Sequence, residues 1–253
     1  MSTLKLHNFN KHFYGVKAVN GLSLEFEAGK ITGLVGPNGS GKSTLINLIT
    51  GIIPKDSGTI FIADGFKTDK IMAQDMYDYK ITRTFQNVRV FEQMSVLDNL
   101  MVVLTHRNAL GALFEKKKKL YEDRAIEILE KLDISEKKHE LAVNLSYGQR
   151  KLLEIGRAIA MDADIILFDE PYAGLFKEMI KKVSEIIKEL REAGKTVILV
   201  EHNMEIIRDL CDTVVVLDAG ELLAHGKPET VLKQRDVVDL MPVASQISRT
   251  EGA

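Results

Sequence analysis

Short apolar runs alternate with amphipathic stretches along most of the chain. Runs rich in β-branched residues predict six strands, at Leu22–Phe26, Ile31–Val35, Thr59–Ile62, Ile165–Phe168, Thr196–Val200 and Thr213–Leu217. Helical spacing of apolar residues predicts helices over Glu178–Glu192 and Glu205–Leu210. Buried strands that alternate with helices are typical of a parallel sheet covered on both faces. The pattern therefore predicts an α/β fold with a parallel-sheet core.

Two regions of the chain depart from this alternation. The first 30 residues and the segment from Thr59 read as strands with no helix between them, which predicts an antiparallel sheet at one side. From about Ser95 to Ala160 the chain reads as helix almost throughout, with Gly111 as a break. In Glu115–Leu132 the residues near helical spacing are Leu120, Ile126, Leu129 and Leu132. We expect one domain over residues 1–235, with a helical subdomain at about 87–160 inserted in the core, and a C-terminal tail at 236–253 whose last residues, Ser245 to Ala253, are frayed.

Composition narrows the class of protein further. The 253 residues are 45% hydrophobic, which is enough for a full core. The 34 basic and 36 acidic residues give a net charge of −2, whereas a general nucleic-acid role favours a basic excess. The single cysteine, Cys211, excludes an intrachain disulfide framework. The N-terminus alternates like a strand rather than a signal peptide, and no apolar run approaches the roughly 18 residues that span a bilayer. If this protein acts at a membrane, we expect it to do so through partner proteins.

A glycine-rich segment lies between the predicted strand Ile31–Val35 and a helical run that begins near Lys42. It reads Gly36-Pro37-Asn38-Gly39-Ser40-Gly41-Lys42-Ser43 and fits the phosphate-loop pattern G-x-x-x-x-G-K-[ST]. Glycines let backbone N–H groups converge on phosphate oxygens, and a helix N-terminus adds positive potential. Lys42 is expected to reach the β- and γ-phosphates and Ser43 to ligate Mg²⁺. The alternative is a chance match by an ordinary turn, against which the flanking strand and helix argue.

A second acidic site follows the apolar run Ile165–Phe168. Asp169 and Glu170 come directly after that run, at the strand edge where open α/β sheets bind ligands. Asp169 is expected to hold Mg²⁺, directly or through water, and Glu170 to polarise the attacking water. Taken by itself, the segment fits a solvated acidic turn about equally well. The phosphate loop in the same chain favours the catalytic interpretation.

One further motif narrows the class of nucleotide hydrolase. Leu145-Ser146-Tyr147-Gly148-Gln149 resembles the signature L-S-G-G-Q of ATP-binding-cassette (ABC) ATPases, with Tyr147 in place of the first glycine. Ser146 can cap the helix that begins here. In that family the signature binds the γ-phosphate held by the opposing subunit, so that two ATP molecules lie between two cassettes. An ordinary capped helix is the alternative for these five residues alone.

Further segments match the same family in its order. Gln86 fits the glutamine loop, and His202 fits the switch histidine. Phe13 stands where the family keeps an aromatic residue that stacks on adenine, with Tyr14 as an adjacent alternative. Either ring could instead pack on the edge of the sheet. The resemblance covers about Leu4 to Leu232. It implies a P-loop NTPase of the ABC-ATPase fold, with a RecA-like core, an antiparallel β subdomain and an α-helical subdomain.

The resemblance also implies residue roles. Catalytic roles fall to Lys42, Gln86, Glu170 and His202. Mg²⁺ ligands are Ser43, Gln86 and Asp169. ATP contacts are Phe13, Gly36, Pro37, Asn38, Gly39, Ser40, Gly41, Lys42, Ser43, Thr44, Ser146, Gly148 and Gln149.

One position departs from the family pattern. After the acidic pair the chain reads Ala173-Gly174-Leu175-Phe176-Lys177, whereas the family has Asp or Asn, often followed by Pro, where this chain has Phe176. The usual residue makes polar contacts across the dimer, and a phenyl ring cannot make them. Communication between the two ATP sites is therefore in doubt, while the hydrolytic residues are all present.

The resemblance points to a branch of the family. The segments Arg83–Phe91, Leu145–Arg150 and Glu201–Met204 look like ATPases of branched-chain amino-acid importers and of the similar urea and amide importers. The lipopolysaccharide-export ATPase is a looser match, because its signature has Gly and Glu where this chain has Tyr147 and Gln149. The expected partners are transmembrane permease subunits, a second ABC ATPase that is the same or different, and indirectly a solute-binding protein. The expected location is the cytoplasmic face of the cell membrane.

Two alternatives to an importer motor remain. A soluble cassette ATPase acting on DNA or ribosomes would carry a long coiled-coil insertion or two cassettes, and this chain has neither. A nucleotide-binding regulator without turnover is disfavoured by Glu170 and His202. The four lysines Lys116–Lys119 are followed by acidic residues, which is typical of a solvated helix face. For the importer, Asn87–Met101 is expected to line a groove that accepts helices of the membrane subunits, through the apolar residues Val88, Val90, Phe91, Met94 and Val96.

Overall fold

The computed structural model describes residues 2–62, 66–68, 71–105 and 115–241. These residues form two compact units. Of the described residues, those within Met1–Thr82, Asp164–Glu170 and Ile187–Ala253 form the first unit, and those within Arg83–Ala163 and Pro171–Ile186 form the second. Residues Gly111 and Ser245–Ala253, for which the sequence predicts a break and a frayed end, lie outside the described residues.

A six-stranded sheet forms the centre of the first unit, in the order β10-β9-β3-β8-β7-β6. Strand β3 pairs in parallel with β8 and β9, and β8 pairs in parallel with β7. Every residue of β3, β7 and β8 is buried, which explains their continuous apolar runs. The strands are β3 (Ile31–Val35), β6 (Ile81–Arg83), β7 (Ile165–Asp169), β8 (Thr196–Val200), β9 (Thr213–Asp218) and β10 (Glu221–Gly226). The predicted parallel core is confirmed.

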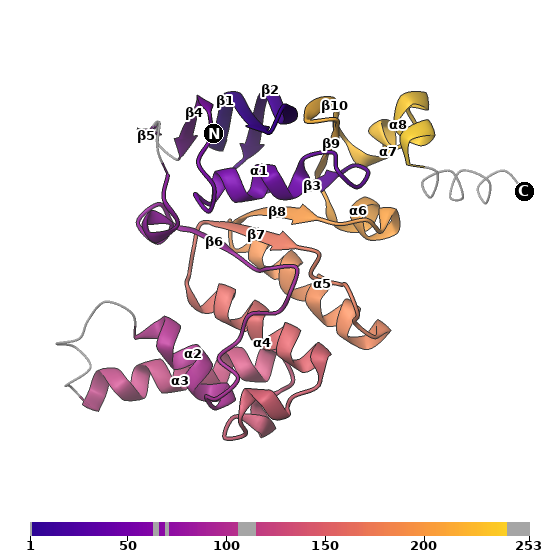
Figure 1. Ribbon diagram of the computed structural model, residues 1–253. Coiled ribbons are helices and arrows are strands. Elements are labelled where there is room, and N and C mark those ends of the chain that lie inside the picture. Colours follow the sequence, from indigo (N-terminus) through magenta and orange to yellow (C-terminus); the bar gives the residue numbers. More distant parts are fainter. Residues whose placement is uncertain (1, 63–65, 69–70, 106–114, 242–253) are drawn as a thin grey trace, which may run out of the picture. The chain divides into compact units, whose positions relative to one another are not determined.

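An antiparallel sheet lies beside this core, in the order β2-β1-β4-β5. Helix α1 (Lys42–Ile49) lies between this sheet and strands β3 and β8 (Figure 1). Its buried residues Leu45, Ile46 and Ile49 share one apolar core with residues of both sheets. The strands are β1 (Ser2–Phe13), β2 (Val16–Glu27), β4 (Ser57–Ile62) and β5 (Phe66–Thr68). The predicted antiparallel sheet is confirmed as well.

Three helices pack together in the second unit. They are α2 (Val96–Leu104), α3 (Glu115–Lys131) and α4 (Tyr147–Ala160). Gly156 lets α4 approach α3 closely: a Cβ there would lie 3.3 Å from Ile128 Cγ2 of α3 and 2.6 Å from Leu132 Cδ1, just after α3. Val96, which the sequence placed among the residues of a partner groove, is fully buried and belongs to the core of this unit. Helix α5 (Lys177–Glu192) begins in this unit and ends in the first. The remaining helices of the first unit are α6 (Met204–Leu210), α7 (Pro228–Val231) and α8 (Arg235–Leu240).

The prediction of helix almost throughout Ser95–Ala160 is wrong between α3 and α4. Asp133 has a left-handed backbone with φ 55°, and Ile134 N–H donates to Leu129 O, so helix α3 ends there. Only the short 3₁₀ turns Ser135–Lys137 and Ala142–Asn144 follow before α4. Leu120, which the pattern counted with the core, is 64% exposed.

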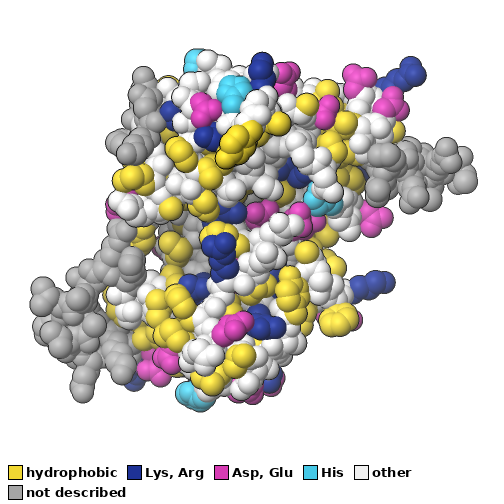
Figure 2. All heavy atoms as spheres, viewed as in Figure 1, with side chains coloured by type: hydrophobic (Ala, Val, Ile, Leu, Met, Phe, Trp, Pro, Cys, Tyr) yellow, Lys and Arg dark blue, Asp and Glu magenta, His cyan; other side chains and the backbone are white. Residues whose placement is uncertain are grey.

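The surface mixes charges of both signs. On the face drawn in Figure 2, basic and acidic side chains lie interspersed with hydrophobic ones. Among the described residues, no helix has the length and the apolar content that crossing a bilayer requires.

Candidate functional site

The phosphate loop connects β3 to α1, and its first and last glycines are sterically required. Gly36 has φ 150°, and a Cβ on it would lie 2.2 Å from Leu217 O. Gly41 has φ 100°, and its Cβ would lie 2.4 Å from Ala18 O. Both distances are far below any real Cβ contact, so neighbouring backbone in β2 and β9 fixes the path of the loop. The loop geometry thus depends on strands that are distant in sequence.

Helix α1 begins with its backbone N–H groups directed at the loop. Gly41 is the N-cap, and no side chain of the described residues caps this end. The first N–H groups of a helix have no intrahelical acceptor and carry a partial positive charge. Ser43 is exposed and Thr44 half-buried at this end. This arrangement is the one that binds phosphate oxygens in phosphate loops.

Lys42 lies over the loop with its side chain largely buried. Its Nζ donates to Gly36 O at 2.8 Å and to Pro37 O at 2.9 Å. Burial lowers the pKa of Lys42, while the nearby carboxylates of Glu170 and Asp169 act in the opposite direction. The ammonium group therefore belongs to the same electrostatic site as the acidic pair, as the sequence predicts.

The acidic pair and the histidine come from neighbouring parallel strands. Asp169 ends β7 and stands opposite Val200, the last residue of β8. Glu170 has a left-handed backbone with φ 49°, and its N–H donates to Val200 O at 3.0 Å. His202 Nε2 then lies 3.0 Å from Glu170 Oε1. Asp169 is buried. Glu170 is half-buried and His202 is exposed, so the Glu170 carboxylate and the His202 imidazole meet at the open edge of the sheet.

The oxygen donors fit a magnesium ion that arrives with a nucleotide. Mg²⁺ takes oxygen ligands, keeps several waters and is usually bound through one or two side chains plus phosphates. The Ser43 hydroxyl and the Asp169 carboxylate offer oxygen atoms of this kind. Ser43 directly follows Lys42 in the sequence, and the charge of Asp169 acts on the Lys42 ammonium group. The described residues hold no group of three or more His, Cys, Asp or Glu side chains that could bind a metal by themselves. The donor set therefore suits a metal completed by phosphate oxygens.

Phe13 stands at the end of the β1–β2 hairpin. Tyr14 and Gly15 form the turn with φ 46° and 89°, and Phe13 pairs with Val16. The Phe13 ring is 40% exposed, and Lys11 Nζ lies 5.2 Å from its centroid. An exposed aromatic face of this kind can stack on a planar base. Tyr14 is fully exposed in the turn.

The signature segment begins α4 in the second unit. Ser146 is the N-cap: its Oγ accepts from Gln149 N–H at 3.3 Å, and Gln149 Oε1 accepts from Ser146 N–H at 3.0 Å. The predicted cap is confirmed, and Gln149 completes it as a capping box. Gly148 is buried against α5, and a Cβ at this position would lie 2.6 Å from Met179 Sδ.

Gln86 is exposed in the second unit, with its backbone carbonyl bound to Lys151 of α4. Three charged residues of α4 contact the backbone around Gln86, namely Lys151, Glu154 and Arg157, called here the α4 row. Burial raises the pKa of Glu154, and the charge of Lys151 opposes that shift. Sequence reasoning missed the α4 row. The available signal was the placement of charged residues three apart on the apolar side of an amphipathic helix.

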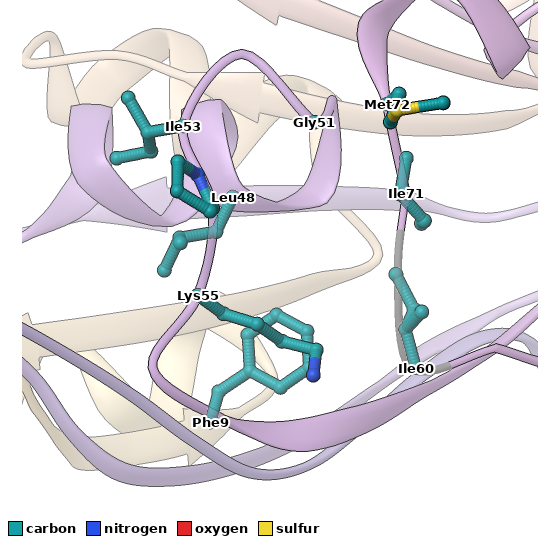
Figure 3. A pocket seen from close by; sticks show the side chains of 9 residues that line it. Phe9, Leu48, Gly51, Ile53, Lys55, Ile60, Ile71 and Met72 are labelled. Atoms are coloured by element: carbon teal, nitrogen blue, oxygen red, sulfur yellow. The ribbon is translucent and has the colours of Figure 1, made fainter.

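A cavity of about 410 Å³ lies in the first unit, apart from the phosphate loop (Figure 3). Phe9, Leu48 and Ile60 come from β1, α1 and β4 and line it together with Gly51, Ile53, Pro54, Lys55, Ile71 and Met72. None of these residues belongs to the predicted ATP site.

Comparison with known proteins shows the family to which this chain belongs. The family model described as ABC transporter matches residues 19–173. The chain is 36% identical to the probable branched-chain amino acid transport ATP-binding protein LivG of Methanocaldococcus jannaschii, over 92% of this chain and 93% of that protein. It is 35% identical to the lipopolysaccharide export system ATP-binding protein LptB of Escherichia coli, over 94% and 95%.

Solved structures agree. The ADP conformation of an ATP-binding cassette of an ABC transporter matches with a TM-score of 0.82 and 32% identity, covering 95% of this chain and 98% of that one. A dimeric cassette bound to ADP and phosphate matches with a TM-score of 0.78 and 27% identity, covering 89% and 98%. The matched segment begins in β2 and runs through the phosphate loop, the signature and the acidic pair. The chain therefore belongs to the ABC transporter ATP-binding family and is an ATP-hydrolysing transporter subunit.

Proposed function

We propose that this chain powers import of a small solute, a branched-chain amino acid or a related amide or urea, from the cytoplasmic face of a membrane. Its similarity to LivG and to LptB is nearly equal, at 36% and 35% identity. The signature motif favours the importer, because Tyr147 and Gln149 resemble the amino-acid import branch of the family rather than the lipopolysaccharide export branch. Lipopolysaccharide-type export is the second candidate, because the LptB similarity covers as much of the chain.

At the ATP site, the contact between Glu170 and His202 supports the assignment of roles. Glu170 is the general base that polarises the attacking water, since its carboxylate lies at the open strand edge near Lys42. His202 orients this carboxylate and stabilises the charge that develops on the γ-phosphate. Lys42 neutralises the β- and γ-phosphates, and Phe13 stacks on adenine.

Ser43 and Asp169 would hold Mg²⁺, with Gln86 as the further ligand implied by the family. When bound, the ion neutralises charge on the phosphates during transfer. The glycines Gly36, Gly39 and Gly41 let the loop backbone approach those phosphates. Pro37, Asn38, Ser40 and Thr44 complete this cradle.

A second cassette subunit would complete the site. Dimeric cassettes are among the structural neighbours, one of them bound to ADP and phosphate. Ser146, Gly148 and Gln149 of a facing subunit would then bind the γ-phosphate. Phe176 is 75% exposed, so its ring is available at the position where the family pattern has a polar contact to the partner. We infer that cassette pairing here uses an apolar contact at this position.

Size-exclusion chromatography of Glu170→Gln, with and without MgATP, tests the pairing. A shift from monomer to dimer with MgATP supports it. Adding Phe176→Asn to that variant should weaken the dimer if the ring contributes. A dimer that is unchanged by Phe176→Asn contradicts the apolar contact. Absence of any shift, with ATP binding measured separately, contradicts self-pairing and favours a different partner cassette.

Uptake measurements test the solute class. Cells of the source organism that lack this gene should lose uptake of radiolabelled leucine, or of urea or short amides, and regain it with the intact gene but not with Glu170→Gln. Normal uptake of all these solutes would contradict the import proposal. An outer-membrane lipopolysaccharide defect in the same cells would support the export candidate.

A further inference from the structure

Lys11 lies over the ring of Phe13 at the end of β1. Its Nζ is 5.2 Å from the ring centroid, within the distance of about 6 Å over which a cation is attracted to an aromatic face. The Lys11 side chain is only 12% exposed, whereas Phe13 is 40% exposed. The ammonium group therefore occupies one face of the ring, and a planar base can stack only on the other face.

Asp56 fixes Lys11 in this position. The residue lies just before β4, and its Oδ1 accepts from Lys11 Nζ at 2.8 Å. Its Oδ2 accepts from His12 N–H at 2.6 Å and lies 3.2 Å from His12 Nδ1, while its own N–H donates to Asn10 O at 2.9 Å. A single residue thus binds three successive residues of β1 directly before Phe13.

These bonds lie where the strand ladders define the path of β1 least. The pairing of β1 with β4 ends at Asn10, and the described part of β1 beyond it pairs with β2 alone. The register between β1 and β2 shifts between Lys11 and His12. Such a bulge changes the direction in which neighbouring side chains point. The contacts with Asp56 therefore supply the restraint on the β4 side and orient Phe13.

The ion pair between Lys11 and Asp56 is too exposed to serve mainly as a source of stability. The Asp56 side chain is 39% exposed, and solvent-exposed ion pairs contribute little to the stability of a fold. The more specific consequence of the pair is geometric. A ring that is ordered before its ligand binds loses less conformational entropy on binding.

We propose that Asp56 and Lys11 are positioning residues for the base of the nucleotide: Asp56 holds the Lys11 ammonium group against one face of Phe13, so that the opposite face is preorganised to stack on adenine. This inference rests on the adenine-stacking role proposed for Phe13. It deepens that role, because it assigns the side chains that orient the ring.

A purely structural role for the pair predicts a different result. Ala18 of β2 lies against the phosphate loop, since a Cβ on Gly41 would be 2.4 Å from Ala18 O. If Lys11 and Asp56 only held the hairpin together, their loss would disturb Ala18 and weaken the binding of phosphate groups as well. If they orient the ring, only the contribution of the base is lost.

The test compares ADP with pyrophosphate, which share two phosphates and differ in the adenosine. Neither ligand carries the γ-phosphate that hydrolysis removes, so both Kd values can be measured at equilibrium with Mg²⁺ present, by displacement of a fluorescent ADP labelled on its ribose. Lys11→Met removes the charge and keeps a side chain of similar length. The ratio of the pyrophosphate Kd to the ADP Kd should fall about fivefold in Lys11→Met, as expected for the loss of one cation–π contact, while the pyrophosphate Kd stays within about twofold.

Two further variants serve as controls. Lys11→Arg keeps a cation that can bind Asp56 and lie over the ring, so it should retain the ratio of the unchanged chain. Lys5→Met removes a more exposed lysine of the same strand, which pairs with Glu25 at 3.4 Å, and it should leave both affinities unchanged. An unchanged ratio in Lys11→Met, or an equal loss of affinity for ADP and pyrophosphate, would overturn the inference.

A double-mutant cycle tests whether Asp56 acts through Lys11. Asp56→Asn keeps the shape of the side chain and removes its charge, so it should lower the ratio about twofold by releasing Lys11. In the Lys11→Met background the same substitution should lower the ratio no further, because the effects of interacting residues are not additive. A further loss of the same size in that background would overturn the role assigned to Asp56.

Phe13→Ala separates this inference from the proposed role of the ring. Loss of base stacking should lower the ratio at least about tenfold. An unchanged ratio in Phe13→Ala would contradict the adenine-stacking role itself. A lowered ratio in Phe13→Ala together with an unchanged ratio in Lys11→Met would leave that role intact and overturn only the positioning role of Lys11 and Asp56.

Discussion

His202 Nε2 lies 3.0 Å from Glu170 Oε1, although 32 positions separate the two residues in the chain. The contact exists because β7 and β8 are adjacent and parallel, so that residues just beyond their carboxyl ends meet. The backbone of Glu170 is fixed in turn by its N–H bond to Val200 O. The carboxylate is therefore oriented from two directions before any substrate binds.

Glu170→Gln should lower ATP turnover by at least about 100-fold, because the amide cannot accept a proton from water. ATP binding should persist, since the loop and Lys42 are unchanged. Phosphate release and the fluorescence of a bound ATP analogue measure the two properties. Glu178→Gln, at the exposed start of α5, is the control. If Glu170→Gln hydrolysed ATP at nearly the rate of the unchanged chain, Glu170 would not be the general base.

His202→Ala should lower turnover by about 100-fold, the size expected when one positioned donor to the reacting phosphate is lost. Folding should be unaffected, because the imidazole is exposed. His225→Ala on β10 is the matched control, since that histidine is also exposed. Equal activity of the two variants would show that the contact with Glu170 has no catalytic consequence.

Gly41→Ala should abolish ATP binding and lower the melting temperature more than Gly194→Ala does. Both glycines have positive φ, so both substitutions carry backbone strain of roughly 1–3 kcal/mol. Only Gly41 would in addition place a Cβ 2.4 Å from a backbone oxygen, that of Ala18, whereas Gly194 has nothing within 4 Å. Equal melting temperatures for the two variants would contradict this account of the loop.

Asp56 should contribute a pH-dependent stabilisation of the first unit. Hydrogen bonds from the Lys11 side chain and from His12 N–H lower the pKa of Asp56. A lowered folded pKa stabilises the fold above the ordinary carboxyl pKa of about 3.9, and the contribution is lost as the pH falls through the folded value. The Asp56 side chain is 39% exposed, so solvent screens the pair and Asp56→Asn should lower the melting temperature at pH 7 by only about 2 °C.

The difference between Asp56→Asn and the unchanged chain should shrink as the pH is lowered from 5 toward 3. Thermal melts at several pH values measure it. A difference that stays constant over this range would show that the hydrogen bonds of the carboxylate do not depend on its charge. Asp236→Asn, at the exposed start of α8, serves as the control.

Cys211 should resist alkylation in the folded protein. The thiol is 8% exposed, and burial, followed by the charges of Asp212 and Glu201, raises its pKa. Because the thiolate is the nucleophile, a raised pKa and low exposure both slow the reaction. Iodoacetamide labelling followed by mass spectrometry should be slow at pH 8 and complete in guanidinium chloride. Rapid labelling without denaturant would contradict the packing of Cys211.

The sequence by itself determined the parts of the fold that depend on local pattern. Continuous apolar runs identified β3, β7 and β8, because strands buried on both faces tolerate few polar residues. The phosphate loop and the N-cap at Ser146 were predictable for a different local reason, since backbone geometry and local hydrogen bonds dictate their residues. Asp169 and Glu170 could be placed at a sheet edge because they directly follow a strand.

Only the tertiary structure decided which distant groups meet. The strand order β3-β8-β7 places His202 beside Glu170, and no local pattern encodes that order. The same holds for the α4 row, whose charges look solvated in sequence but find backbone partners in Phe85–Phe91. The break after α3 escaped prediction because no Gly or Pro marks it: Asp133 adopts the left-handed backbone that ends the helix. Long-range pairing is a property of the packed chain, because each buried polar group requires a partner that only the fold supplies.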